Sequence, residues 1–258
     1  MWRKTYSGVQ KINISGVIFE VNFDQLESNI YTKQMIYQCY ELHMVAALKK
    51  YLKPGGIFID VGANVGYLSA VGASLVGQTG KVISFEPVPV IFQTLQNITT
   101  LNPNYKITVC NKAISENDCQ LLMDCTTLKD CGGSTAVSGF LDIIHVEKKH
   151  STTVNAIRLD GYLLDNDIQD VSLIKIDVEG FEFSVLKSLE KYFSETPFRP
   201  IVICELAPAA LKLLDLTVKD LFNYMMQFGY HAYDIYDCET PLDGNTIYHT
   251  TDVVFKTA

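Results

Sequence analysis

The chain has 258 residues and carries 21 Lys and Arg against 29 Asp and Glu, a formal net charge of −8. This length suits one large domain with a full hydrophobic core. Hydrophobic residues make up 48% and charged residues 19%, which excludes a disordered tail and a coiled coil. An acidic chain repels a phosphate backbone, so we expect no nucleic-acid partner.

Neither a membrane span nor a disulfide framework is expected. The sequence contains no apolar run of about 18 residues and no apolar stretch near its N-terminus, so we predict no transmembrane helix and no signal peptide. The seven cysteines form no CxxC pair and no Cys/His spacing typical of zinc. These features favour reduced thiols in a cytoplasmic protein.

The first 52 residues are expected to form a cap on the rest of the molecule. Apolar residues alternate over 9–23 around a Ser-Gly pair, which predicts a β-hairpin. Residues 34–52 have helical spacing and end before Pro-Gly-Gly. We therefore treat 1–258 as a single domain, with 1–52 as the cap and 53–258 as an α/β core.

From residue 56 onward, short apolar strands alternate with helical patterns. Strands that are apolar throughout, with helices between them, predict a parallel sheet covered on both faces, as in a doubly wound α/β fold. The segment 114–156 is less regular and reads as a hairpin or loop excursion over one edge of that sheet. The predicted strands are 57–59, 81–85, 107–110, 171–176, 200–205, 231–236 and 250–255, and the predicted helices are 65–75, 89–101, 181–191 and 217–228.

A glycine-bearing turn follows the first core strand. Asp60 ends the strand, and Gly62 and Gly66 flank Asn64 before the next helix begins. Asn64 stands where a dinucleotide fingerprint needs glycine, and no Lys-Ser/Thr follows, so this is neither that motif nor a P-loop. Glycines here let a backbone approach a ligand, and Asp60 suits a ligand with positive charge, such as S-adenosylmethionine. A tight strand-to-helix turn without a ligand is the alternative.

The next two strands also end in residues suited to a nucleoside. Glu86 follows the second strand about twenty residues after Gly66, where an acidic side chain can accept both ribose hydroxyls. A surface carboxylate in the turn before Pro87 is the alternative. The third strand runs into Lys112 and Ala113, where a backbone amide could meet adenine.

Three motifs resemble the FkbM family of S-adenosylmethionine-dependent methyltransferases. They are Asp60-Val61-Gly62-Ala63-Asn64-Val65-Gly66, Phe85-Glu86-Pro87 and Lys175-Ile176-Asp177-Val178-Glu179-Gly180. Shorter matches are Tyr40-Glu41, Gly133-Ser134-Thr135 and Leu159-Asp160, so the resemblance spans roughly residues 40 to 206. The N-terminal hairpin and the last fifty residues lie outside it.

The resemblance implies a class I methyltransferase fold, Rossmann-like with a mostly parallel seven-stranded sheet in three layers. It also implies methyl transfer to a hydroxyl oxygen of a sugar or a microbial natural product. With the turns described above, it leads us to expect cofactor contacts from Glu41, Asp60, Gly62, Asn64, Gly66, Glu86, Pro87, Ala113 and Asp177.

The chemistry is expected at the carboxyl ends of the strands, where open α/β sheets bind ligands. Asp177 is our first candidate near the reactive end of the cofactor, and Glu179 either contacts the acceptor or braces the turn at Gly180. His231, after Gly229-Tyr230, is a third candidate and could act as a base. We predict no metal; if Mg²⁺ does take part, its ligands would be Asp177, Glu179 and Glu205.

Other enzyme classes fit the sequence less well. No Asn/Asp-Pro-Pro-aromatic turn and no Pro-Cys pair occur, which argues against nucleic-acid or protein N-methyltransferases and cytosine C5 enzymes. The glycine fingerprint of a nicotinamide dehydrogenase is absent. We expect an O-methyltransferase acting on a small-molecule or glycan acceptor, most simply a sugar unit. A polyketide or peptide acceptor, a non-catalytic S-adenosylmethionine-binding module and a homodimer stay open.

Overall fold

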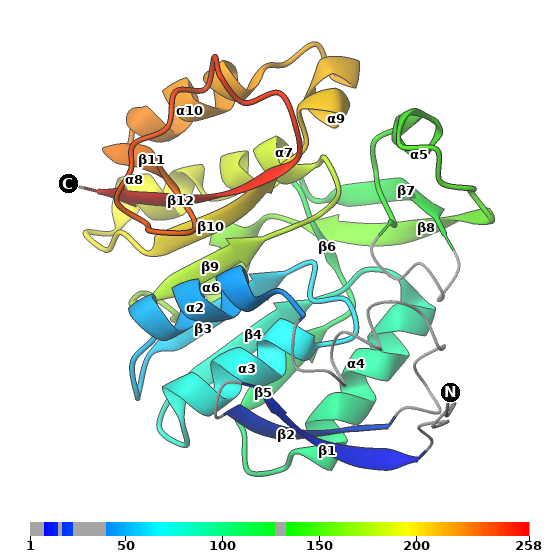
Figure 1. The fold of residues 1–258 in the computed structure, drawn as a ribbon, viewed down its shortest axis with the longest axis vertical. Helices are drawn as coiled ribbons and strands as arrows, with labels where there is room; N and C mark the ends of the chain where they lie inside the picture. Colours follow the sequence, from blue (N-terminus) through cyan, green and yellow to red (C-terminus); the bar gives the residue numbers. More distant parts are fainter. Residues whose placement is uncertain (1–7, 15–16, 23–39, 127–132, 258) are drawn as a thin grey trace, which may run out of the picture.

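A mostly parallel sheet of seven strands forms the centre of the protein, seen in the computed structural model in Figure 1. The structure describes residues 8–14, 17–22, 40–126 and 133–257. The strands follow the spatial order β11-β12-β10-β9-β3-β4-β5. Their bounds are β3 Ile57–Val61, β4 Lys81–Phe85, β5 Ile107–Cys110, β9 Leu173–Ile176, β10 Ile201–Leu206, β11 Tyr230–Asp234 and β12 Thr251–Thr257.

One strand, β12, runs against the others. It pairs antiparallel with both β10 and β11, whereas the pairs β10–β9, β9–β3, β3–β4 and β4–β5 are parallel. The strands at the centre are mostly apolar and almost entirely buried, because helices cover both of their faces. This topology confirms the class I methyltransferase fold that the sequence predicts, with its mostly parallel seven-stranded sheet.

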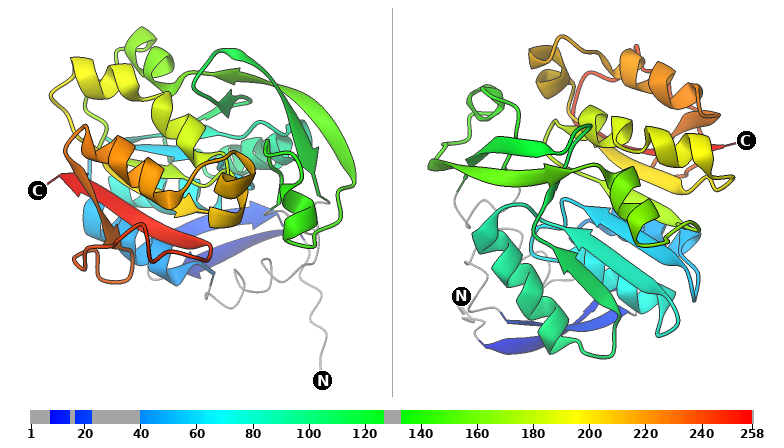
Figure 2. Two further views of the ribbon diagram at one scale, coloured as in Figure 1. Left: turned by 90° about the horizontal axis from the view of Figure 1, so that it is seen from above. Right: turned by 180° about the vertical axis from the view of Figure 1, so that it is seen from behind.

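Two apolar clusters lie on opposite faces of the sheet. On one face lie α2 (Leu42–Tyr51) and α3 (Tyr67–Val76), with α4 (Pro89–Leu101) beside β5. The other face is covered by α6 (Leu159–Asp165), α7 (Glu182–Lys187), α8 (Glu190–Glu195) and α10 (Val218–Met226), seen as yellow and orange helices in the rear view of Figure 2. The short α9 (Pro208–Leu213) follows β10. No helix of the described ranges is both long and apolar enough to cross a bilayer.

The N-terminal hairpin packs outside α3 and α4. Strands β1 (Val9–Ile14) and β2 (Val17–Asn22) pair antiparallel, as predicted, although the turn at 15–16 lies outside the described residues. Asn102, at the end of α4, bonds the backbone N–H and C=O of Glu20 at 2.8 and 2.9 Å. Because α3 lies between the sheet and this hairpin, nearly all of its side chains are buried, and it carries no charged residue.

The helix predicted over 34–52 begins later than expected. Residues 34–39 lie outside the described part, and α2 begins at Leu42 after a turn at Tyr40 and Glu41. Glu41 adopts the left-handed region, with φ of 45°. A residue in that conformation cannot continue a right-handed helix, so the chain turns sharply there and sets its side chain at the start of α2.

The irregular segment forms a small second sheet. Strands β6 (Ala113–Ile114), β7 (Cys119–Cys125) and β8 (His150–Ile157) have the order β6-β8-β7, and α5 (Phe140–Ile143) lies in the connection between β7 and β8. This sheet stands at the right of Figure 1, in green. The predicted hairpin is therefore present, and it extends the core rather than lying as a loose loop.

The single helix predicted over 181–191 is two short helices. Ser188 ends α7 by donating its hydroxyl to the carbonyl of Val185 at 2.6 Å, and α8 begins at Glu190. A serine side chain that bonds back to the preceding turn competes with continuation of the helix, which explains the break.

Candidate active site

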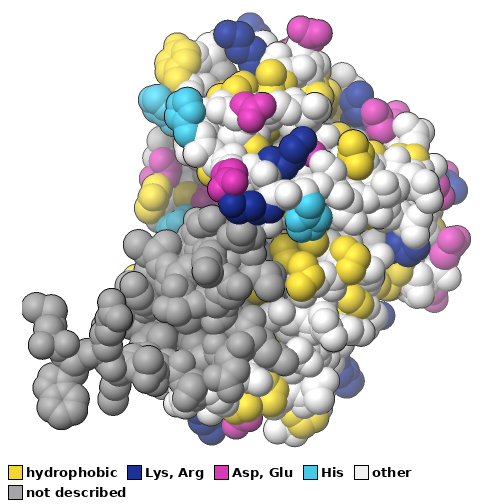
Figure 3. Space-filling view, turned by 90° about the vertical axis from the view of Figure 1, so that its right-hand side faces the viewer, with side chains coloured by type: hydrophobic (Ala, Val, Ile, Leu, Met, Phe, Trp, Pro, Cys, Tyr) yellow, Lys and Arg dark blue, Asp and Glu magenta, His cyan; other side chains and the backbone are white. Residues whose placement is uncertain are grey.

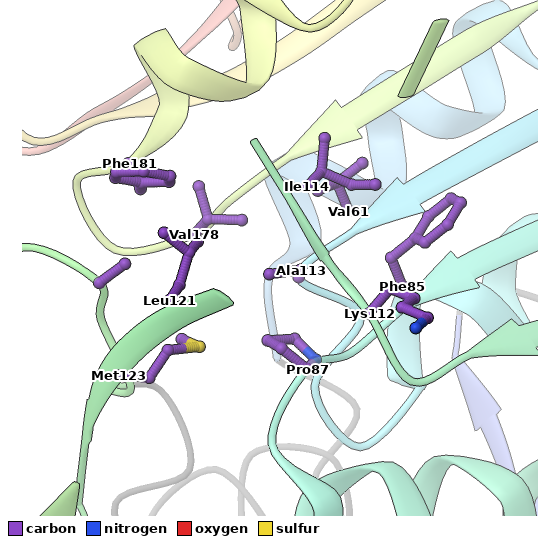
Figure 4. Close-up of a pocket in the computed structure, with 12 residues that line it drawn as sticks. Val61, Phe85, Pro87, Lys112, Ala113, Ile114, Leu121, Met123, Val178 and Phe181 are labelled. Carbon is purple, nitrogen blue, oxygen red and sulfur yellow. The ribbon is translucent and has the colours of Figure 1, made fainter. Parts of the chain in front are cut away.

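A pocket opens where β3, β4 and β9 end and the small sheet begins. Its space amounts to about 330 Å³, including its open mouth. In Figure 4 the side chains of Leu121 and Met123 on β7 face Pro87 and Ala113 across this space. Val178 and Phe181, from the turn after β9, complete the apolar wall. Such a wall suits a flat apolar group rather than a charged one.

Gly62 allows two loops to meet at the edge of this pocket. Its φ is 77°, and a Cβ atom built on it would lie 1.8 Å from the carbonyl oxygen of Asp177. Gly66 has φ of 88°, and a Cβ there would lie 2.6 Å from Leu95 Cδ1. At both positions the turn after β3 needs glycine for its conformation and for close approach.

Glu86 ties the turn after β3 to the turn after β4. Its side chain is 5% exposed and accepts hydrogen bonds from the backbone N–H of Asn64 at 3.0 Å and of Val88 at 2.8 Å. Burial raises its pKa to about 7, although both bonds act to lower it. Glu86 thus lies in the loops around the pocket, and Pro87 and Ala113 line the pocket directly. Contact with a ribose stays a prediction.

Asp60 is fully buried rather than open to the pocket. One carboxylate oxygen accepts from the hydroxyl of Ser69 at 2.6 Å, and the other lies 3.5 Å from Lys175 Nζ. Direct contact of Asp60 with a cofactor stays a prediction. Within this structure its carboxylate acts on the site through Lys175.

Lys175 lies at this edge of the sheet as well, and the sequence analysis assigns it no role. It stands in β9 opposite Asp60, is 3% exposed, and lies 3.2 Å from Asp177 Oδ2. Its Nζ also donates to the carbonyl of Gly62 at 2.9 Å. Burial alone would lower its pKa, but Asp177, Asp60 and Glu41 together raise it. A lysine inside an otherwise apolar strand was the signal that could have found it.

Three carboxylates gather beside this lysine. Asp177, Glu179 and Glu205 each offer an oxygen, and these oxygens lie within 4.8 Å of one another. Burial raises the pKa values of Glu179 and Glu205, and the charge of Asp177 raises them further. The sequence predicted these residues to meet at one edge of the sheet, and the structure brings them together. Such a cluster takes up protons or attracts a cation.

Glu182, rather than Glu179, braces the turn after β9. The fully buried Glu182 accepts from the backbone N–H of Gly180 at 2.8 Å and of Val178 at 3.2 Å. Glu179 has φ of 55°, and its backbone carbonyl accepts the hydroxyl of Thr135 at 2.6 Å. The carboxylate of Glu179 therefore belongs to the acidic cluster. The Gly-Ser-Thr motif contributes Thr135, whose hydroxyl anchors the turn after β9.

A histidine–aspartate pair lies at the same edge. His43 Nε2, in the first turn of α2, is 2.8 Å from Asp252 Oδ2. Asp252 is the register partner of Glu205 across β10 and β12. Glu41, two residues before His43, has its pKa raised to about 7 by burial and then by Asp177. The sequence analysis predicts Glu41 as a cofactor contact and assigns no role to the pair of His43 and Asp252.

His231 does not reach this edge. It is exposed near the start of β11 and pairs with Lys256 on β12. The next residue of β12 toward the site, Phe255, pairs with Val202 at the start of β10, whereas Glu205 lies near the end of that strand. His231 is thus level with the amino end of the sheet, and the geometry gives it no part in the site.

The described part of the face drawn in Figure 3 shows no gathering of basic side chains. Over its described part, blue Lys and Arg side chains are interspersed with magenta Asp and Glu. The expectation that nucleic acid is not a partner stays a prediction, as do the sugar acceptor and the homodimer.

Comparison with known families decides the assignment. The model of the family described as "Methyltransferase FkbM domain" matches residues 60–232. The chain belongs to this family. The match begins at Asp60, includes Asp177 and Glu205, and confirms the resemblance seen in the sequence; it supports methyltransferase activity for the chain.

Other similarities are more distant. Protein-L-isoaspartate O-methyltransferase 1 of Arabidopsis thaliana is 42% identical over 52 residues, which is 20% of this chain and 23% of that protein. Aeropyrum pernix fibrillarin with bound S-adenosyl-L-methionine is 10% identical, covering 98% of this chain and 95% of its own, with a TM-score of 0.45. Precorrin-6y C5,15-methyltransferase of Geobacter metallireducens is 10% identical, covering 85% and 89%, with a TM-score of 0.45.

Proposed function

We propose that this FkbM-family chain transfers a methyl group from S-adenosylmethionine to a hydroxyl oxygen of a small acceptor, with a sugar or glycan unit as the acceptor class. One observation carries the proposal. The apolar pocket beside Gly62 and Val178 lies next to the carboxylates of Asp177, Glu179 and Glu205 at one edge of the sheet.

The residues present fit S-adenosylmethionine. Its adenine has flat, apolar faces, which suit the wall formed by Leu121, Met123 and Pro87. Its sulfonium and ammonium groups are positively charged, and the acidic cluster attracts positive charge. The glycine at 62 leaves the backbone open where a side chain would block the approach of the two loops.

When bound, S-adenosylmethionine supplies a methyl group on a sulfonium, whose thioether leaves without assistance. The chain's own residues then have to hold the cofactor, align the acceptor hydroxyl and exclude water. Lys175 fixes the position of Asp177 at 3.2 Å, and the turn braced by Glu182 fixes Glu179. The acidic edge is therefore built on buried, rigid contacts rather than on a mobile loop.

A divalent cation is the second candidate for the acidic cluster. Carboxylate oxygens from Asp177, Glu179 and Glu205 are the ligand type that Mg²⁺ prefers, and a metal could lower the pKa of an acceptor hydroxyl. The proposal does not require the ion. Each binding experiment is therefore run with Mg²⁺ and with EDTA.

Calorimetric titration with S-adenosylhomocysteine tests the proposal, with NAD as the control ligand. We expect S-adenosylhomocysteine to bind with Kd on the order of micromolar and NAD not to bind. Asp60→Ala and Glu86→Ala should weaken binding, the first through Lys175 and the second through the turn at Asn64. The matched controls Asp165→Ala and Glu195→Ala remove exposed carboxylates and should bind as the parent does.

The outcomes separate the alternatives. Binding of NAD alone would favour a dehydrogenase. Unchanged affinity in both Asp60→Ala and Glu86→Ala would refute this placement of the cofactor. Binding of S-adenosylhomocysteine without methyl transfer to any hydroxyl would favour the non-catalytic module, and a gain in affinity only with Mg²⁺ would assign the acidic cluster to the metal.

A further inference from the structure

The pair of His43 and Asp252 joins two distant parts of the chain at the edge that holds the acidic cluster. The two residues are 209 positions apart, and Nε2 lies 2.8 Å from Oδ2. Their side chains are 28% and 19% exposed, so both are sheltered yet open to a small molecule. Since Asp252 is the register partner of Glu205, the pair lies one strand beyond the cluster.

The bond to Asp252 decides which ring nitrogen of His43 can act as a base. A carboxylate accepts the proton on Nε2, so in the neutral ring the lone pair is on Nδ1. Among the described residues Nδ1 has no hydrogen-bond partner, whereas Nε2 is held by Asp252. Asp252 thus orients the imidazole and stabilises the charge that appears when Nδ1 takes a proton, as in the carboxylate–histidine pairs of hydrolases.

An exposed aromatic ring stands next to this histidine. Tyr236, in the connection from β11 to β12, is 82% exposed, and its ring centroid lies 5.6 Å from that of His43. Its backbone N–H donates to Asp234 Oδ1 at 2.7 Å, which fixes the turn that presents it. An exposed aromatic face is a surface on which the apolar face of a sugar ring can stack.

We propose that His43 is the general base for the acceptor hydroxyl, that Asp252 is its positioning residue, and that Tyr236 forms the wall on which an acceptor sugar ring stacks. This inference rests on the proposed function and adds the acceptor side to it. The three parts of the site then follow the order of the strands in the sheet: the pocket lies at β3 and β4, the carboxylates at β9 and β10, and the His43–Asp252 pair at β12.

The step balances as a proton transfer coupled to displacement. His43 Nδ1 takes the proton of the acceptor hydroxyl while the acceptor oxygen forms its bond to the methyl carbon. The carbon–sulfur bond breaks, and its electron pair stays on sulfur as a neutral thioether. The imidazolium of His43 remains paired with Asp252 and afterwards releases its proton to water.

The charged and titratable neighbours of His43 set the pH at which it can act. Asp252 faces it from β12, Glu41 from the start of α2, and Tyr236 from the β11–β12 connection. The hydrogen bond to Asp252 raises the pKa of His43, against the lowering by burial. Because a base must be unprotonated, the rate should rise with pH through this raised pKa. In Asp252→Asn the rise should move to lower pH while kcat falls.

The first test follows the imidazole signals of ¹³C-histidine-labelled protein saturated with S-adenosylhomocysteine. The chain has five histidines, and His43→Gln assigns the signal of interest. The probes are the methyl glycosides of glucose, galactose, mannose and rhamnose. At least one should shift the His43 signal, Tyr236→Ala should abolish that shift, and Tyr248→Ala should not. Tyr248 is a matched control, 75% exposed in the same connection.

The second test measures methyl transfer to the glycosides that shift the signal. His43→Gln should lower kcat by about 100-fold or more with little change in KM, and Tyr236→Ala should raise KM. His231→Gln is the control histidine and should leave both unchanged.

Failure of the inference is distinguishable from failure of the proposed function. Parent protein that binds no S-adenosylhomocysteine contradicts the function itself. Parent protein that binds it, while no glycoside shifts His43, overturns the acceptor site. A shift without methyl transfer by the parent contradicts the function, whereas transfer that His43→Gln leaves within twofold of the parent overturns only the role of His43 as base.

Discussion

Replacing Lys175 by Met should destabilise the fold more than any surface charge replacement. The substitution keeps a long side chain in β9 but removes the cation from between Asp60 and Asp177, at 3.5 and 3.2 Å. Asp60 is fully buried and would keep only the hydroxyl of Ser69 as a partner. Asp177 is 28% exposed, so water replaces much of what it loses.

The magnitude follows from the stranded Asp60 carboxylate. Removing one member of a buried ion pair costs about 3–5 kcal/mol, because the remaining charge has lost both solvent and partner. For a chain of this size each kcal/mol lowers Tm by about 2–4 °C, so Tm should fall by roughly 6–20 °C. Lys191→Met, which removes an exposed pair with Glu195, should cost about 0–1 kcal/mol.

Urea unfolding followed by circular dichroism at pH 7 measures these differences. The decisive comparison is the double variant Lys175→Met with Asp60→Asn, which removes the stranded charge and should recover most of the lost stability. A loss below about 1 kcal/mol in Lys175→Met, or no recovery in the double variant, would refute the argument that Lys175 stabilises the edge by neutralising Asp60.

Three further predictions concern the backbone, the pH dependence and a helix cap. Gly62→Ala should abolish S-adenosylhomocysteine binding in calorimetry, because its Cβ would lie 1.8 Å from a carbonyl oxygen. Gly77→Ala is the matched control: Gly77 has φ of 67° and ψ of −166° with open space around it, so the substitution should cost about 1–3 kcal/mol and leave binding normal. The pKa of Glu86 is raised from 4.5 to about 7, so its contribution to the free energy of unfolding is full below pH 4.5 and is lost as the pH rises through about 7. In Glu86→Gln the free energy of unfolding, measured with urea at a series of pH values, should depend less on pH over this range. Thr217→Ala removes a capping box with Asp220 and should cost about 1 kcal/mol of unfolding free energy without changing ligand affinity.

The strands and the first helices could be predicted because local signals bound them. The helix at Pro89–Leu101 starts at a proline and stops before Asn-Pro, and the structure has these bounds. The central strands are short apolar runs next to glycine turns, so their burial on both faces follows from composition.

What the sequence reasoning missed depends on contacts between distant positions. β7 and β8 pair along their whole length, but the excursion carries no strong local pattern. His43 and Asp252 are 209 positions apart in the sequence and meet only in the folded chain. Sequence analysis names His231 because acceptor loops often lie at a position like the one after Gly229-Tyr230, whereas the register of β11 with β12 places it at the other end of the sheet. Contacts between residues far apart in the sequence leave no periodic pattern, so they cannot be predicted from a single sequence.

The candidate site was predicted in part for the same reason. The end of a strand can be recognised from the local sequence, and the carboxyl ends of parallel strands lie at one edge of the sheet. The proximity of Asp177, Glu179 and Glu205 therefore followed from the predicted topology. The burial of Asp60 did not, since it depends on Lys175 and Ser69 closing over it from β9 and α3.

The central proposal for this protein is that this edge of the sheet transfers a methyl group to a hydroxyl oxygen. The most direct measurement incubates the protein with S-adenosylmethionine carrying a ¹³C methyl group and the panel of methyl glycosides, and identifies by NMR the atom that receives the label. We expect an O-methyl product that disappears in His43→Gln. A label on nitrogen or carbon, or no transfer by protein that binds S-adenosylhomocysteine, would contradict it.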